Sequence, residues 1–177
     1  MKRNSWIVCS LAALFLGQIA AFGQTTTTAV YAVDATISYK VAKTTGSLPG
    51  SATATFLSDG TFSLIGSSST NSLQFSGTYS VPKNGKSATI KSSADEIATM
   101  KSDIASIIEG DIQSEFPGAT VTINSLRWSK LSLSGGVPVS ASITGSGKGC
   151  EGKHCKSFTF KVTATFGACQ LSTCSSL

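Results

Sequence analysis

The residues best suited to chemistry gather in one stretch near the C-terminus, GKGCEGKHCKSFTF (147–160). This stretch holds two cysteines, three lysines and the only histidine of the chain. Thiols and an imidazole at this spacing could bind a metal, or one thiol could act as a nucleophile with the imidazole as its base. Alternatively, the two thiols could form a disulfide. The choice among these chemistries depends on the compartment and on the elements that carry the residues.

The N-terminus predicts export. A positively charged start precedes an apolar run over residues 6–16, and Ala21 and Gly23 stand two apart, the small-residue spacing that signal peptidase requires. We therefore expect residues 1–23 to be a secretory signal peptide and residues 24–177 to form a single β-rich domain, periplasmic or extracellular. The apolar run is shorter than the roughly 20 residues that span a bilayer, which disfavours a membrane anchor.

Four cysteines remain after cleavage, and an even number in an exported chain indicates disulfides. If the residues between Cys155 and Cys169 form one extended strand, these two cysteines lie about 46 Å apart. A disulfide needs Cα atoms within about 7 Å. We therefore predict two local bonds, Cys150–Cys155 and Cys169–Cys174, with His154 exposed at the tip of the first loop. A strong bend in the strand would leave a four-cysteine metal site as the alternative.

Catalytic constellations are nearly absent. A Ser-His-Asp or Cys-His arrangement would have to use His154, which lies in the small loop between Lys153 and Lys156. The segment GSGKGC (145–150) lacks the residues of a phosphate-binding loop and lies between strands. We therefore expect no catalytic residue, no cofactor, no metal and no enzyme activity. Only 13% of the residues are charged, which argues against nucleic-acid binding.

The elements that position these residues are expected to be antiparallel strands. From residue 31 to 41, apolar and polar side chains alternate, which is typical of a strand with one buried face. The pattern recurs along the chain, with a tight-turn signal at NG (84–85) and a change of register between Trp128 and Leu131 that suggests a bulge. The sequence predicts a mainly β fold: an eight- to nine-stranded antiparallel, strongly curved sheet or barrel with one amphipathic helix inserted after the fifth strand.

The helix is predicted over residues 93–118. Ser93 and Glu96 form a capping box, which satisfies backbone N–H groups at a helix start. Five apolar residues share one stripe at helical spacing: Ile97, Met100, Ile104, Ile107 and Ile108. Asp111 would fall in the same stripe, so we expect the helix to end or kink near Gly110. Its polar residues are mostly acidic, so we expect it to cover the β core rather than an anionic membrane surface.

A curved sheet of this size could enclose a small apolar ligand. The residues expected to line such a cavity are aromatic: Tyr31, Tyr39, Phe56, Phe62, Phe75 and Tyr79. The same rings, together with the helix, could instead fill the core. The alternative function is then a periplasmic or surface protein-interaction module, inhibitor- or adhesin-like, with a filled core and an unusual exposed loop. A basic rim around that loop would consist of Lys148, Lys153, His154 and Lys156.

Two segments, SATATFLSDGTFSL (51–64) and LQFSGTYSVPKNGKSATIK (73–91), carry a strand–DG–strand and then a GTY–turn–strand pattern. This pattern resembles that of small bacterial lipocalin-like domains. The matching residues are Phe56, Asp59, Gly60, Phe62, Gly77, Tyr79, Asn84 and Gly85. The resemblance implies an exported barrel that binds a small hydrophobic molecule.

The export prediction has a direct test. Protein isolated from its native host is expected to lack its first 21 to 23 residues and to begin between Phe22 and Gln24. N-terminal sequencing checks this. Intact Met1 on a soluble cytoplasmic protein would contradict the compartment and the disulfide argument with it.

Overall fold

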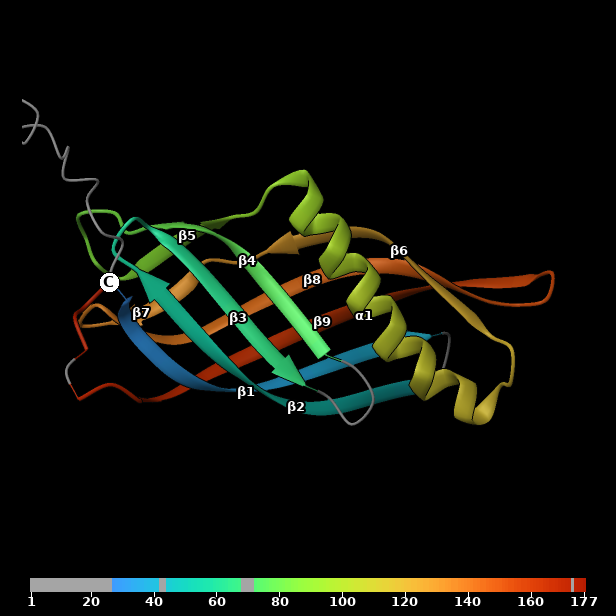
Figure 1. Ribbon diagram of the computed structural model, residues 1–177. Coiled ribbons are helices and arrows are strands. Elements are labelled where there is room, and N and C mark those ends of the chain that lie inside the picture. The colour runs from blue at the N-terminus through green and yellow to red at the C-terminus, as the bar shows by residue number, and fades with distance from the viewer. Residues whose placement is uncertain (1–26, 42–43, 68–71, 173) are drawn as a thin grey trace, which may run out of the picture.

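The chain forms nine strands and one helix in the computed structural model, which describes residues 27–41, 44–67, 72–172 and 174–177 (Figure 1). The predicted signal peptide, residues 1–23, lies outside the described residues. In chain order the elements are β1 (Thr27–Val41), β2 (Thr44–Leu57), β3 (Thr61–Ser67), β4 (Ser72–Ser80), β5 (Ser87–Lys91), α1 (Ala94–Glu115), β6 (Thr120–Trp128), β7 (Leu131–Ser134), β8 (Val137–Glu151) and β9 (His154–Cys169).

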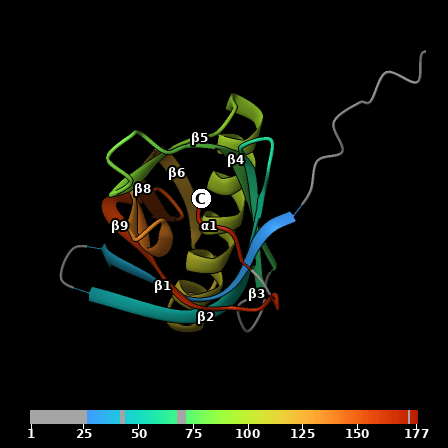
Figure 2. The same cartoon turned by 90° about the vertical axis from the view of Figure 1, so that its left-hand side faces the viewer.

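The strands form one antiparallel sheet in the order β6-β8-β7-β5-β4-β3-β2-β1-β9. Because β8 also pairs with β9, eight of these strands close into a barrel and β6 is an additional strand along β8. Figure 2 looks along this barrel from the end at which the C-terminus lies. The mainly β class, the number of strands and the position of the helix after the fifth strand are therefore confirmed.

Burial alternates along the strands as the sequence predicts. In β1, Tyr31, Val33, Ile37 and Tyr39 are buried, and the polar side chains between them face outward. The inward faces meet in a single apolar core that includes residues from all nine strands and from α1. The barrel is therefore held together chiefly by burial of these side chains.

The predicted bulge between Trp128 and Leu131 is instead a break between two strands. Both β6 and β7 pair with β8, with Trp128 opposite Ile143 and Ser132 opposite Ser140. At the break, the Ser129 backbone N–H donates to the Ser142 carbonyl oxygen at 2.7 Å. The change in apolar register thus marks the break between β6, which pairs with the second half of β8, and β7, which pairs with its first half.

The helix begins as expected and continues past Gly110, where the sequence predicts an end or a kink. The Ser93 hydroxyl accepts from the Glu96 N–H at 3.2 Å, and the Glu96 carboxylate accepts from the Ser93 N–H at 2.6 Å, which confirms the capping box. Of the two outcomes expected near Gly110, an end or a kink, an end is wrong, because α1 continues to Glu115. Asp111 does fall on the inner side, where its carboxylate accepts a hydrogen bond from the Tyr39 hydroxyl. This hydrogen bond from Tyr39 allows the Asp111 carboxylate to lie on the apolar side of the helix.

Helix α1 covers a gap in the barrel wall. β4 pairs with β5 only from Thr78 to Ser80, so the first part of β4 has no strand on that side. The helix packs against β4 and β6 across this gap (Figure 1). Its buried residues Met100, Ile104, Ile107 and Ile108 complete the core there.

Polar side chains of α1 also bind the free backbone groups on both sides of the gap. On β4, the Gln74 N–H donates to the Asp103 carboxylate at 3.4 Å. On β6, the Val121 N–H donates to Glu109 at 2.8 Å, and Lys101 donates to the Asn124 carbonyl oxygen at 3.0 Å. The helix therefore supplies hydrogen bonds that a further strand would otherwise make, and two unpaired sheet edges are covered.

The docking of α1 is tested by one pair of substitutions. Ile104→Asp is expected to lower the free energy of unfolding by about 3 kcal/mol or more, because it buries an unpaired charge in the core. Ser106→Asp, on the exposed side of the same helix, is expected to cost less than about 0.5 kcal/mol. Urea titration measures both, and equal effects would mean that the helix does not dock on the barrel.

Candidate functional site at the barrel mouth

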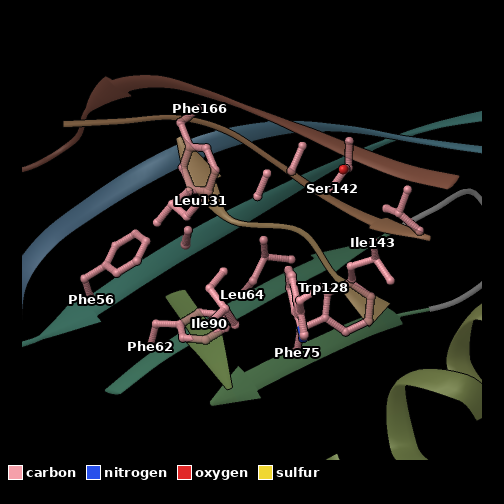
Figure 3. A pocket seen from close by; sticks show the side chains of 15 residues that line it. Phe56, Phe62, Leu64, Phe75, Ile90, Trp128, Leu131, Ser142, Ile143 and Phe166 are labelled. Atoms are coloured by element: carbon pink, nitrogen blue, oxygen red, sulfur yellow. The ribbon is translucent and has the colours of Figure 1, made fainter. Parts of the chain in front are cut away.

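The interior of the barrel is filled by side chains. Its central void has a volume of about 30 Å³ and is lined almost entirely by apolar groups (Figure 3). Phe56, Phe62 and Phe75, three of the six residues expected to line a ligand cavity, do border this void. The Trp128 ring closes edge-on against Phe62 and Phe75, at centroid distances of 5.9 and 6.1 Å. Small-molecule sites usually measure about 300–1,000 Å³, so this void has no room for such a ligand.

Two other expected lining residues, Tyr31 and Tyr79, do not border this void. Tyr31 is buried with its ring edge-on to Phe56 and Phe166, at 6.1 and 6.2 Å. The Tyr79 hydroxyl donates to the Leu57 carbonyl oxygen at 2.9 Å. Burial raises the pKa of both tyrosines above the ordinary value, so both phenols stay protonated as part of the packed wall.

A larger space opens where the barrel meets the C-terminal end of α1. This mouth cleft has a volume of about 480 Å³ and lies between that helix end, the end of β1 with the start of β2, and the β8–β9 hairpin. Its lining residues are Tyr39, Val41, Thr45, Gly46, Asp111, Ile112, Glu115, Phe116, Ala119, Gly149, Cys150, Glu151, His154 and Lys156. The cleft therefore joins the sixth expected lining residue, Tyr39, to the cysteine- and histidine-bearing stretch.

Tyr39 lies at the buried side of the mouth cleft. Its ring lies across Gly46, its register partner on β2, where any side chain would overlap the phenol. Its hydroxyl donates to the Asp111 carboxylate. Burial, this hydrogen bond and the negative charges of Asp111 and Glu115 raise the pKa of Tyr39 well above the ordinary value. Tyr39 is thus a fixed hydrogen-bond donor in this cleft and not a phenolate base.

Two more aromatic rings lie across glycines on a neighbouring strand. Phe160 is opposite Gly145 and Phe158 is opposite Gly147, and a Cβ at either glycine would overlap the ring. Gly149 follows on the same face of β8, but no atom lies within 4 Å of the position its Cβ would take. The alternating glycines of this stretch therefore make room for rings inside the barrel, and the last one borders the mouth cleft.

The hairpin at the mouth is closed by the expected disulfide. Cys150 and Cys155 are register partners on β8 and β9, with Cα atoms 4.1 Å apart. The turn between the strands begins at Gly152, whose φ of 57° is readily adopted only by glycine. His154 and Lys156 are exposed and line the mouth cleft, which confirms the exposed tip histidine. The hairpin projects beyond the barrel in Figure 1.

The second expected disulfide, Cys169–Cys174, lies at the other end of β9 with Cα atoms 6.4 Å apart. The chain after it crosses that end of the barrel, where the Ser175 N–H donates to the Thr28 carbonyl oxygen at 3.2 Å. The Leu177 N–H donates to the Gly136 carbonyl oxygen at 3.0 Å. This disulfide therefore holds the C-terminal segment against the barrel and takes no part in the mouth cleft.

Within the described ranges, no group of three or more His, Cys, Asp or Glu side chains could hold a metal ion. Among the helices of the same ranges, none is long and apolar enough to cross a bilayer. No family model, curated protein or solved structure matches this chain. The resemblance to lipocalin-like domains therefore stays a prediction, and the function has to be argued from the mouth cleft and the surface.

The packing of rings on glycines predicts different costs for one substitution at two nearby sites. Gly145→Ala is expected to lower the free energy of unfolding by about 1–3 kcal/mol, because the new methyl group overlaps both the Ser125 carbonyl oxygen and the Phe160 ring. Gly149→Ala, which meets open space, is expected to cost less than about 0.5 kcal/mol. Urea denaturation of the two variants checks the difference, and a neutral Gly145→Ala would refute the packing argument.

Proposed function

We propose that this protein is an exported, non-enzymatic β-barrel module that binds a small amphipathic molecule in the mouth cleft rather than inside the barrel. The observation that carries the proposal is the contrast in volume. The barrel interior has a void of about 30 Å³, whereas the mouth cleft offers about 480 Å³, within the usual range for small ligands. Two disulfides and the N-terminal signal pattern support export.

The walls of the mouth cleft match a ligand with an apolar body and a polar end. Val41 and Ile112 supply apolar surface, and the Phe116 side chain is 46% exposed at the end of α1. A ligand seated there would remove this apolar surface from water. The Tyr39–Asp111 pair lies at the buried side, so a polar ligand group would meet groups that are already oriented.

The rim of the mouth cleft carries charges of both signs. Glu115 belongs to the helix wall, and Glu151, His154 and Lys156 belong to the hairpin wall. An anionic head group would be attracted by Lys156 and a cationic one by Glu115. Because both kinds of charge are present, the apolar contact with Phe116 is the part of the site that either ligand would share.

The filled core and the projecting disulfide hairpin also support the alternative, a protein-interaction module. In that case the hairpin itself would be the contact surface, and the mouth cleft would bind no small molecule. A small-molecule probe therefore separates the two functions.

The experiment uses anilinonaphthalene sulfonate, a fluorescent probe with an apolar ring system and one anionic group. We expect saturable binding to the folded protein, and roughly tenfold weaker binding to Phe116→Ser, which corresponds to the loss of about 1.4 kcal/mol of contact. The control is Ile65→Ser, because Ile65 is 57% exposed on β3 and does not line the cleft. Equal affinity of the two variants, or no binding to the native protein, would contradict the proposal.

A further inference from the structure

The outward side chains of four adjacent strands form rows on one wall of the barrel. The strands are β1, β9, β8 and β6, which neighbour one another in that order through antiparallel pairing. One row runs through Ser38, Lys161, Thr144 and Arg127. The next row runs through Lys40, Thr159, Ser146 and Ser125, and a third through Ser157, Lys148 and Thr122. We call these three rows the cationic face.

The cationic face consists of hydroxyl groups and positive charges only. Its four cations are Lys40, Arg127, Lys148 and Lys161, and all of them are exposed. The other members of the rows are serines and threonines, and within them the Ser125 and Ser146 hydroxyls hydrogen-bond to each other at 2.8 Å. Such hydroxyls can both donate and accept hydrogen bonds.

Acidic residues are concentrated on α1, which borders the cationic face along β6. Six of the nine in the chain lie on α1: Asp95, Glu96, Asp103, Glu109, Asp111 and Glu115. On β1, Asp34 is four residues from Ser38, which places it roughly 13 Å from the nearest row. Glu151 belongs to the hairpin tip beyond the third row and lines the mouth cleft. The positive charge of the cationic face is therefore not balanced by a carboxylate within its rows.

The spacing of the cations suits an extended ligand rather than a single ion. Lys161 and Arg127 share a row but are two strands apart, or about 10 Å. Lys40 and Lys148 lie in the two following rows, each on a different strand. A small anion could contact only one of these cations, whereas a linear polyanion could contact several.

We propose that the cationic face binds an acidic polysaccharide. Carboxylate or sulfate groups would form charge-assisted hydrogen bonds with the lysines and Arg127, and the sugar hydroxyls would pair with the serines and threonines between them. The three rows contain no aromatic side chain on which the bases of a single-stranded nucleic acid could stack. They also contain no large apolar or aromatic anchor of the kind that dominates protein interfaces.

This surface is distinct from the mouth cleft and does not depend on the small-molecule proposal. None of the four cations lines the cleft. The two ligands could therefore be bound together, and loss of one activity need not affect the other.

The test measures binding of polygalacturonate, which carries a carboxylate on each sugar, with neutral dextran as the reference polymer. We expect polygalacturonate binding at about 0.05 M sodium chloride, strong weakening at about 0.5 M, and no dextran binding, because added salt screens exposed charges. Arg127→Glu/Lys161→Glu is expected to bind about tenfold more weakly or worse.

The control is Lys83→Glu/Lys86→Glu in the turn between β4 and β5, which changes the net charge by the same amount away from the cationic face. Far-ultraviolet circular dichroism and urea midpoints check that both variants fold, and Arg127→Gln/Lys161→Gln replaces the charge reversal if it does not fold. Binding of anilinonaphthalene sulfonate should be unchanged in every folded variant.

Three results would overturn the proposal. The first is equal loss of polygalacturonate binding in the control, which would leave only a net-charge effect. The second is polygalacturonate binding no stronger than dextran binding. The third is tighter binding to single-stranded DNA or to phosphatidylglycerol vesicles than to polygalacturonate, which would assign the face to a different partner.

Discussion

The structure depends on how helix α1 closes the barrel between β4 and β6. The strand that should extend the wall at this point, β5, reaches β4 over three residues only. Without the helix, the edges of β4 and β6 and the apolar interior behind them would face water. α1 covers the interior with four buried apolar residues and binds the edges through Asp103, Glu109 and Lys101. One amphipathic helix thus supplies both apolar side chains to the core and hydrogen bonds to the two strand edges.

The position of the mouth cleft follows from this closure and from the rings inside the barrel. Tyr39, Phe158 and Phe160 lie across glycines, so their rings pack directly against the sheet, and little space remains inside the barrel. The helix continues past Gly110 because Asp111 meets the Tyr39 hydroxyl, which brings the helix end beside the hairpin. The space of the mouth cleft therefore lies outside the packed interior, where three elements end together.

Much of the fold follows from local patterns. Two-residue alternation, the capping box at Ser93 and the short distance between paired cysteines each depend on a few consecutive residues, and all three are confirmed. The length of α1 is different, since Asp111 needs a partner 72 residues away in sequence. The sequence does not predict the mouth cleft for the same reason. The alternating glycines of GSGKG (145–149) are a signal for it, but their meaning depends on Phe158 and Phe160 across the sheet.

The pairing of β1 with β9 sets an order of events for a chain that emerges N-terminus first. β1 is made early, but its second neighbour is the last strand, so one side of β1 stays unpaired until almost the whole chain is available. Both disulfides also join cysteines within the final 28 residues. Closure and oxidation are thus late events dominated by contacts between distant parts of the chain, which fold slowly. An incomplete chain that lacks β9 cannot close the barrel, so one edge of β1 and the apolar interior behind it stay exposed to water until β9 is made.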